Sequence, residues 1–246
     1  MLPIVLVHGF PLDARMWASQ AAFLRGLGRV VMTPDLPGFG GRVALGREET
    51  SMEAFAREVH RVIVREAGGK AIVGGFSMGG YVLQALLRDH PESVAAAMFI
   101  CTRAEADAPA VHDGRMKAAE EVARTGTAGL IDAMLGKVMA KQPSPTVKAQ
   151  VRAIMESQFA EGVACAQLAM ARRRDQTDLL SGLKIPVLIL VGAEDAVSPP
   201  SVALGMQACV PSAMLVQIAA AGHMAPMEQP AAVNAAIETF LATIHC

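Results

Sequence analysis

Six short runs of apolar, β-favouring residues recur along this 246-residue chain and alternate with helix-length segments. The runs are apolar on both faces, which is typical of strands buried inside a parallel sheet. The segments between them carry apolar residues at helical spacing, as in Met52–Glu66 and Ala231–Ile244. This alternation predicts an α/β fold, a mostly parallel sheet with helices on both faces. The expected strands are Ile4–Val7, Val30–Thr33, Ala71–Gly74, Ala95–Cys101, Val187–Val191 and Met214–Ile218.

The interval from residue 104 to residue 182 breaks the alternation, because it shows helical patterning without a convincing strand. The expected helices are His112–Thr125, Leu130–Ala140, Val147–Gln158 and Gly162–Arg172. Helices inserted after one strand and before the next would form a lid above the strand ends. We therefore predict that residues 1–103 and 183–246 form the core and that residues 104–182 form a helical cap.

Composition and charge narrow the possible classes of protein. Apolar residues make up 52% of the chain and charged residues 18%, which suits a globular protein. The net charge of −1 provides no electrostatic footprint for nucleic acid or for an anionic membrane. No apolar run approaches the roughly 18 residues of a membrane span, and the N-terminus lacks the basic region of a signal peptide. The scattered cysteines predict a cytoplasmic protein with reduced thiols: Cys101, Cys165, Cys209 and Cys246.

The segment from Gly75 to Gly79, with the sequence Gly-Phe-Ser-Met-Gly, predicts a strand, a tight turn and a helix with Ser77 at the apex. A serine on such a turn adopts strained backbone angles, so small residues must lie two positions away on either side. Gly75 and Gly79 meet this demand. The turn would lift the Ser77 hydroxyl out of the sheet and place the Met78 amide at a helix N-terminus. Because five-residue patterns arise by chance, the serine needs partners.

A serine hydroxyl is a weak nucleophile until a base removes its proton, and the base needs a third group to orient it. His223 lies on a loop after the last expected strand, and Asp195 lies just past Val187–Val191. Glu194 is the nearest alternative acid and ranks below Asp195. Ser77, Asp195 and His223 thus fall on three strand-end loops, in the chain order that this sheet requires. We expect them to form a triad.

A second donor for an oxyanion is expected on the loop after the first strand, where His8, Gly9 and Phe10 stand. Gly9 lets the backbone approach a substrate, and the Phe10 amide can then point inward. His8 is expected to brace this loop without taking part in the chemistry. The amides of Phe10 and Met78 are therefore the expected oxyanion hole.

These motifs resemble the α/β-hydrolase superfamily on both sides of the helical insertion. The resemblance implies that Ser77 is the nucleophile, His223 the base and Asp195 its orienting acid. It also implies that the Phe10 and Met78 amides form the oxyanion hole and that the insertion is a cap domain. The matching segments are His8-Gly9-Phe10 with Trp17, Pro34–Gly40, Gly75–Gly80, Gly192–Asp195 and Gly222-His223.

Among subgroups, Gly9–Trp17 and Thr102–Asp107 look most like bacterial carboxylesterases and enol-lactonase-like hydrolases. A serine at the elbow argues against the dehalogenase and epoxide hydrolase branches, which use aspartate there. The chain opens on what is the third strand of the usual fold, so the antiparallel first hairpin is expected to be missing. The expected sheet is then about six-stranded and mostly parallel.

The resemblance implies hydrolysis of a carboxylic ester through an acyl-enzyme on Ser77. The few aromatic residues favour a short or medium aliphatic acyl group on a small, largely apolar substrate. The methionines of the insertion are expected either to pack or to line an adaptable apolar pocket, and the pocket candidates are Met134, Met139 and Met170. Arg103 follows a strand end and is a candidate for binding a substrate carboxylate. An alternative function, an enol-lactone hydrolase or a carbon-carbon bond hydrolase of a keto-acid, would need such a residue. The alternative role of Arg103 is an ion pair with Glu105 or Asp107.

Two other functions are alternatives. A signalling receptor on this fold would keep the same residues. A hydroxynitrile lyase needs a basic residue beside the triad, which Met224 does not provide. No metal or organic cofactor is expected, because no cluster shows ligand spacing and Gly74–Gly80 lacks the Lys-Ser/Thr of a phosphate loop. The expected partner is a small-molecule ester, without nucleic acid or membrane, and the oligomeric state stays open.

Overall fold

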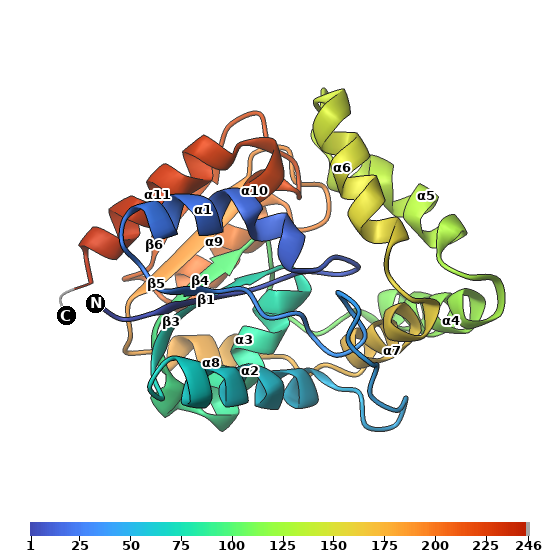
Figure 1. Cartoon of the computed structure of the whole chain (residues 1–246), viewed down its shortest axis with the longest axis horizontal. Coiled ribbons are helices and arrows are strands. Elements are labelled where there is room, and N and C mark those ends of the chain that lie inside the picture. Colours follow the sequence, from blue (N-terminus) through green and yellow to red (C-terminus); the bar gives the residue numbers. More distant parts are fainter. Residues whose placement is uncertain (245–246) are drawn as a thin grey trace.

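The computed structural model describes residues 1–244 and contains one sheet of six parallel strands (Figure 1). The strand order is β2-β1-β3-β4-β5-β6. The strands are β1 (Ile4–Val7), β2 (Val31–Met32), β3 (Ala71–Phe76), β4 (Val94–Ile100), β5 (Val187–Gly192) and β6 (Met214–Ile218). The prediction of a mostly parallel sheet of about six strands is confirmed. Cys246, expected to be a reduced thiol, and His245 lie outside the described residues.

Helices cover both faces of the sheet, because successive side chains of each buried strand point to opposite sides. Ile4 belongs to the apolar core under α1 and α11, whereas Val5 belongs to the core under α2 and α3 (Figure 1). The helices of this part are η1 (Ala14–Trp17), α1 (Ala18–Gly26), α2 (Met52–Glu66), α3 (Met78–Asp89), η2 (Pro91–Ser93), α9 (Pro200–Cys209), α10 (Ala225–Glu228) and α11 (Pro230–Ala242).

Several strands end one or two residues from the expected bounds, and the largest differences concern β6 and β3. The sequence predicts that Met214–Ile218 is buried on both faces, but in β6 only Ile218 is buried and Gln217 is exposed. The reason is that β6 pairs only with β5 and forms an edge of the sheet. At the centre of the sheet, β3 continues to Phe76, two residues beyond the expected end, so Ser77 follows it directly.

The helical insertion occupies the connection between β4 and β5. Its helices are α4 (Pro109–Thr125), α5 (Ala128–Val138), α6 (Pro145–Glu156), α7 (Ala160–Ala171) and α8 (Thr177–Ser181). The first four correspond to the four expected helices. All four begin two or three residues earlier than expected, and in α4 and α6 a proline occupies the first turn, where its fixed φ suits a helix. The sequence did not predict α8, which packs against α9.

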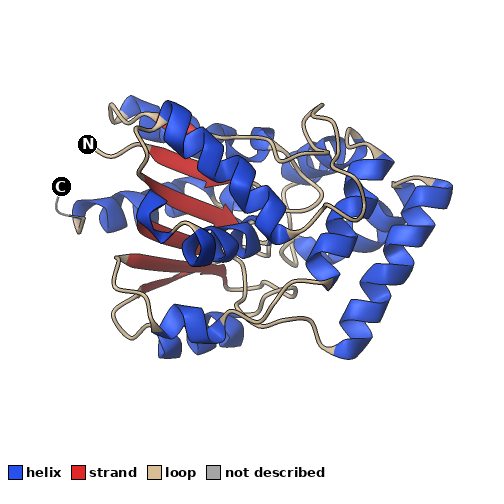
Figure 2. Cartoon of the chain, turned by 90° about the horizontal axis from the view of Figure 1, so that it is seen from below, coloured by secondary structure: helices blue, strands red, loops and turns tan. Residues whose placement is uncertain are grey.

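The insertion lies beyond the carboxyl ends of the strands. Figure 2 shows the strand arrows pointing toward a group of helices that stands apart from the sheet, and Figure 1 identifies this group as α4 to α7. Ligand sites of parallel sheets open at this edge. The exact division at residues 104 and 182 stays a prediction. No helix of the described residues is long and apolar enough to cross a bilayer.

Candidate active site

Ser77 lies at the turn between β3 and α3 with a left-handed φ of 50°. Such backbone angles cost a non-glycine residue roughly 1–3 kcal/mol. A Cβ on Gly75 would lie 2.2 Å from the carbonyl oxygen of Gly79, and a Cβ on Gly79 would lie 2.3 Å from that of Val7. The Ser77 amide donates to the Ile100 carbonyl at 2.9 Å and ties the turn to β4. The two glycines therefore permit a turn that presents the hydroxyl at the end of the sheet.

The structure brings together the three residues expected to form a triad. Ser77 Oγ lies 2.9 Å from His223 Nε2, and His223 Nδ1 lies 2.8 Å from Asp195 Oδ2. The side chains of Asp195 and His223 are almost completely buried. Glu194, the alternative acid, does not reach the histidine, because its Oε2 accepts a hydrogen bond from the Lys141 amide at 2.8 Å.

The Asp195 carboxylate is held on both oxygens. Its Oδ1 accepts hydrogen bonds from the amides of Val197 and Ser198, each at 2.8 Å, and this leaves Oδ2 for His223. Because a carboxylate faces Nδ1, that nitrogen carries the proton of the neutral imidazole. Nε2 is then free to accept the proton of Ser77. The geometry thus pairs a hydroxyl with an oriented base.

The loop after β1 is braced by His8, which is fully buried. Its Nδ1 donates to the Gly9 carbonyl at 2.9 Å, and its Nε2 accepts from the Leu36 amide at 3.0 Å. Burial lowers the pKa of His8, so the ring is neutral at pH 7. A Cβ on Gly9 would lie 2.5 Å from the ring of Phe76, so only glycine fits between this loop and β3.

Phe10 and Met78 are the residues whose amides are expected to form the oxyanion hole. Phe10 lines the cavity that contains Ser77 and His223, and Met78 is the first residue of α3. Among the hydrogen bonds of the described residues, none uses the amide of Phe10 or Met78 as donor. Both amides are therefore without an acceptor in the described part of the chain, and that of Met78 lies at a helix N-terminus.

A cavity of about 410 Å³ lies over Ser77, between the strand ends and the helical insertion. Met134 and Met170 line it, as the sequence predicts for a pocket of this kind. Met139 does not line it: the residue follows the end of α5 and its side chain belongs to the buried core. Arg103 does not line it either, because its guanidinium is held by the carbonyl of Val197. These two positions correct the expected pocket.

Four polar residues line the cavity that the sequence did not predict as site residues: Tyr81, Arg115, Lys137 and Gln167. Arg115 lies on α4, Lys137 on α5 and Gln167 on α7. Their helices were expected, but no local pattern indicates which face of each helix turns toward the serine. Arg115 donates from Nη1 to Gln167 Oε1 at 3.2 Å, so two helices of the insertion meet at this wall.

Asp107 forms ion pairs with two arginines beside this wall. Its buried Oδ2 lies 2.6 Å from Nε of Arg115 and 2.8 Å from Nη1 of Arg173. Burial alone would raise the pKa of Asp107, but hydrogen bonds from Arg173 and Arg115 outweigh it and lower the pKa. The Arg173 guanidinium also lies 4.2 Å from the centre of the Tyr81 ring. Asp107 therefore pairs with these two arginines and not with Arg103.

Cys101 is a buried thiol beside the triad, and ligand atoms of Cys101, Asp195 and His223 lie within 4.8 Å of one another. Burial, with the nearby charge of Asp195, raises the pKa of Cys101 well above its usual range. A thiol must lose its proton to bind a metal. This group is therefore poorly suited to hold an ion, and the contacts of Asp195 and His223 favour the triad arrangement.

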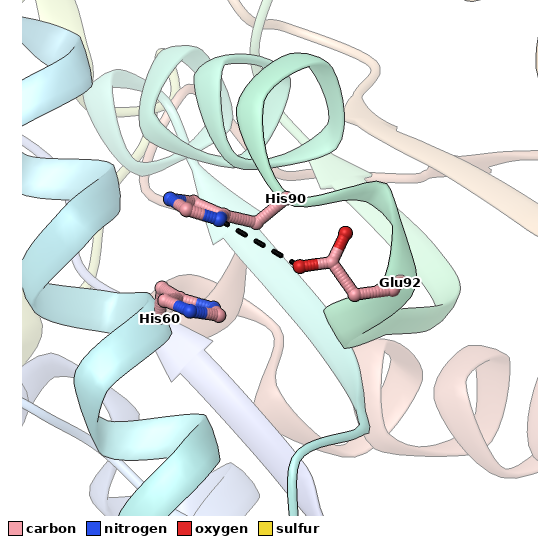
Figure 3. A group of neighbouring side chains, drawn as sticks. All are labelled: His60, His90 and Glu92. Carbon is pink, nitrogen blue, oxygen red and sulfur yellow. Dashed lines mark ion pairs between the residues drawn. The ribbon is translucent and has the colours of Figure 1, made fainter.

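A second group of this kind contains His60, His90 and Glu92, far from Ser77 along α3 (Figure 3). The two imidazole rings stack with centroids 3.8 Å apart and planes 5° from parallel. The nitrogen lone pairs lie in the ring planes, and parallel planes do not meet at one ion. The observed arrangement therefore does not bind a metal unless one ring rotates.

Comparisons with known proteins place these observations in a family. Residues 4–236 match the family described as "Alpha/beta hydrolase family". The chain is similar to a pimeloyl-[acyl-carrier protein] methyl ester esterase of Citrobacter koseri, with 28% identity over 236 residues, 92% of this chain and 89% of the relative.

Solved structures show the same fold. A thermophilic esterase from Thermogutta terrifontis, with malate bound, superposes with a TM-score of 0.95 at 39% identity and covers 100% of this chain and 91% of its own. An enol-lactonase from Burkholderia xenovorans superposes with a TM-score of 0.87 at 24% identity, over 98% and 92% of the two chains. The fold, the match over most of the chain and the esterase relative agree, and this chain belongs to the alpha/beta hydrolase family.

Proposed function

We propose that this chain is a carboxylic ester hydrolase that acts through an acyl-enzyme on Ser77. The observation that carries the proposal is the continuous contact from Ser77 Oγ to His223 Nε2 at 2.9 Å and from His223 Nδ1 to Asp195 at 2.8 Å. Nucleophile, base and orienting acid are thereby within hydrogen-bond reach in the order that acyl transfer requires. The esterases among the similar proteins support the same class of reaction.

In the first half of the reaction, His223 removes the proton of Ser77 as the hydroxyl oxygen attacks the ester carbonyl. The amides of Phe10 and Met78 donate to the oxyanion that forms. Asp195 stabilises the imidazolium, which then gives its proton to the departing alcohol. In the second half, water loses a proton to His223, attacks the acyl-enzyme and releases the acid with Ser77 restored.

The cavity supports a small substrate. Its volume of about 410 Å³ lies at the lower end of the range for small-molecule sites. In this proposal, α4, α5 and α7 act as a cap over the substrate, and Met134 and Met170 contact its apolar part.

The test is hydrolysis of p-nitrophenyl acetate and butyrate by wild type and by Ser77→Ala. We expect the variant to lose turnover and keep its circular dichroism spectrum. Ser181→Ala is the matched control, because Ser181 is exposed on α8. Turnover near wild type in Ser77→Ala contradicts the proposal. Turnover well below about 1 s⁻¹ on every ester would instead favour the signalling receptor or a substrate outside the set tried.

One observation favours a second candidate, an enol-lactone or keto-acid hydrolase. Arg115 and Lys137 are cationic residues of the cavity wall, and none of the described lining residues is acidic. An anionic substrate fits such a wall. The test compares a carboxylated ester with its neutral methyl analogue in wild type and Arg115→Gln. The second candidate predicts that the variant raises KM only for the carboxylated ester, and equal effects on both contradict it.

A further inference from the structure

A carboxylate outside the triad joins the helical insertion to the loop that carries His223. Glu228 stands at the end of α10, and its Oε2 accepts from the amide of Gly222, the residue before the histidine, at 2.8 Å. Its Oε1 accepts from the amide of Ala140, two residues past α5, at 2.7 Å. The Glu228 carboxylate thus accepts one hydrogen bond from the loop that carries His223 and one from the helical insertion.

A second carboxylate does the same for the loop that carries Asp195. Glu194 Oε2 accepts from the amide of Lys141 at 2.8 Å. The amide of Glu194 in turn donates to the carbonyl of Ala221 at 2.8 Å, which links the two loops. The consecutive amides of Ala140 and Lys141 are therefore each held by a carboxylate from a different triad loop.

The backbones meet without space between them. The amide of Met224, the residue after His223, donates to the carbonyl of Val138 at 3.0 Å. A Cβ on Gly222 would lie 2.4 Å from the Ala140 nitrogen, so any larger residue would push the insertion away. We call residues 138–141 the contact segment. It rests directly on the residues on both sides of His223.

The same segment also reaches the cavity. Val138 lines the cavity over Ser77, and so do Leu130, Met134 and Lys137 on the preceding turns of α5. A displacement of α5 against a substrate therefore moves the segment that rests on the histidine loop. Charged acceptors make stronger hydrogen bonds with amides than neutral ones do, which suits two carboxylates to this task.

The environment of Glu228 shows that this arrangement is not a surface contact. The side chain is half-buried, and burial, with repulsion from Glu194 and Asp195, raises its pKa, while its two amide partners oppose the rise. Placing a third carboxylate near Asp195 is electrostatically unfavourable unless its hydrogen bonds are needed.

We infer that Glu228 and Glu194 are positioning residues for the proposed ester hydrolysis. They hold the loops of His223 and Asp195 at the contact segment, so that the insertion sets the alignment of the base with Ser77. This inference rests on the proposed function. It assigns no proton transfer to either glutamate.

The first experiment uses Glu228→Gln. The glutamine oxygen accepts from one amide, but its NH₂ group faces the other, so one hydrogen bond is lost with the shape preserved. We expect kcat for p-nitrophenyl butyrate to fall about tenfold, the scale of a lost hydrogen bond to a charged group, with KM changed less than about twofold. Glu238→Gln, on the exposed face of α11, is the matched control and should keep wild-type kcat.

Rates are expressed per active site titrated with a serine-directed organophosphate, so that only folded enzyme is counted. A brace that served only the fold would lower the melting temperature and leave kcat per titrated site unchanged. That result in Glu228→Gln overturns the inference. Absence of ester turnover in the wild type is a different result, because it removes the proposed function first and the inference with it.

The second experiment approaches from the insertion. Ala140→Pro removes the donor and leaves Glu228 intact, and Met139 already has the extended φ and ψ of −95° and 157° that a residue before proline prefers. We expect a similar fall in kcat, and no further fall when Ala140→Pro and Glu228→Gln are combined, because both remove one contact. Fully additive losses would show that the two residues act separately and would overturn the inference.

Discussion

His60 on α2 and His90 at the end of α3 stack their imidazole rings at 3.8 Å, nearly parallel (Figure 3). Burial lowers the pKa of His60, the charge of a protonated His90 lowers it further, and Glu92 opposes the change. Protonation of both rings at once is therefore unfavourable in the folded protein. The packing of α2 against the end of α3 should therefore weaken as pH falls and the rings become protonated.

The sign of this effect follows from linkage. The pKa of His60 is lower in the folded chain than its unfolded value of about 6.5, so the unfolded chain binds more protons between the two values. The contribution of His60 to the stability of the fold is complete above about pH 6.5 and is lost as pH falls toward its folded pKa. We expect His90→Gln to reduce this loss, as measured by urea unfolding at pH 7.5, 6.5 and 5.5. The partly exposed His112→Gln is the control, and an unchanged pH dependence in His90→Gln would contradict the repulsion.

The ion pairs of Asp107 should make the stability of the fold depend on pH in stronger acid. Its pKa is lowered by Arg173 and Arg115 against the effect of burial, so its contribution is present above about pH 4 and lost as pH falls through the folded value. Asp107→Asn leaves two arginines without their anion and should cost about 3 kcal/mol or more at pH 7. The difference from wild type should shrink below pH 4, as followed by urea unfolding. A constant difference across this range would show that the ion pairs are not its source.

The elbow glycines give a steric prediction. Gly79→Ala places a Cβ 2.3 Å from the Val7 carbonyl oxygen, in contact with backbone that cannot yield. We expect a loss of several kcal/mol or failure to fold, measured by thermal unfolding of the soluble fraction. Gly136→Ala is the counterpart: on α5 its Cβ meets nothing within 4 Å, and it should stabilise the helix by about 0.5–1 kcal/mol. Equal stability of the two variants would show that the space around Gly79 is not limiting.

Substitutions of Asp195 and Glu194 test which of the two acids orients His223. Asp195→Asn removes the acceptor that keeps the proton on His223 Nδ1, and kcat should fall on the order of 10³-fold or more. Glu194→Gln disturbs only the contact with Lys141 and should cost about tenfold. Active-site titration and initial rates with p-nitrophenyl butyrate distinguish the two. Similar losses in both variants would mean that the two acids have been assigned wrongly.

The sheet and the three residues of the proposed triad follow from local patterns. Strand runs are readable because buried parallel strands are apolar on both faces, and Ser77, Asp195 and His223 each come just after such a run. Since the carboxyl ends of parallel strands meet at one edge, residues in these positions must converge. For β6 the sequence predicts the bounds but not the burial, because burial depends on whether another strand pairs with its outer edge.

The cavity wall follows from no such rule. Met134 and Met139 are only five residues apart, yet one lines the cavity and the other joins the core, because α5 ends between them. Arg103 follows a strand end but is held by Val197, while Arg115 enters the wall through its bond to Asp107.

Periodicity and spacing along the chain were thus enough to determine the α/β sheet, the insertion and the three residues that meet as Ser77, His223 and Asp195, since each depends on neighbours in sequence or on a shared sheet edge. The tertiary structure alone decided which helix faces line the cavity and that Glu228 and Glu194 hold residues 140 and 141. Those contacts join segments more than fifty residues apart, and they form only through the packing of the insertion on the core.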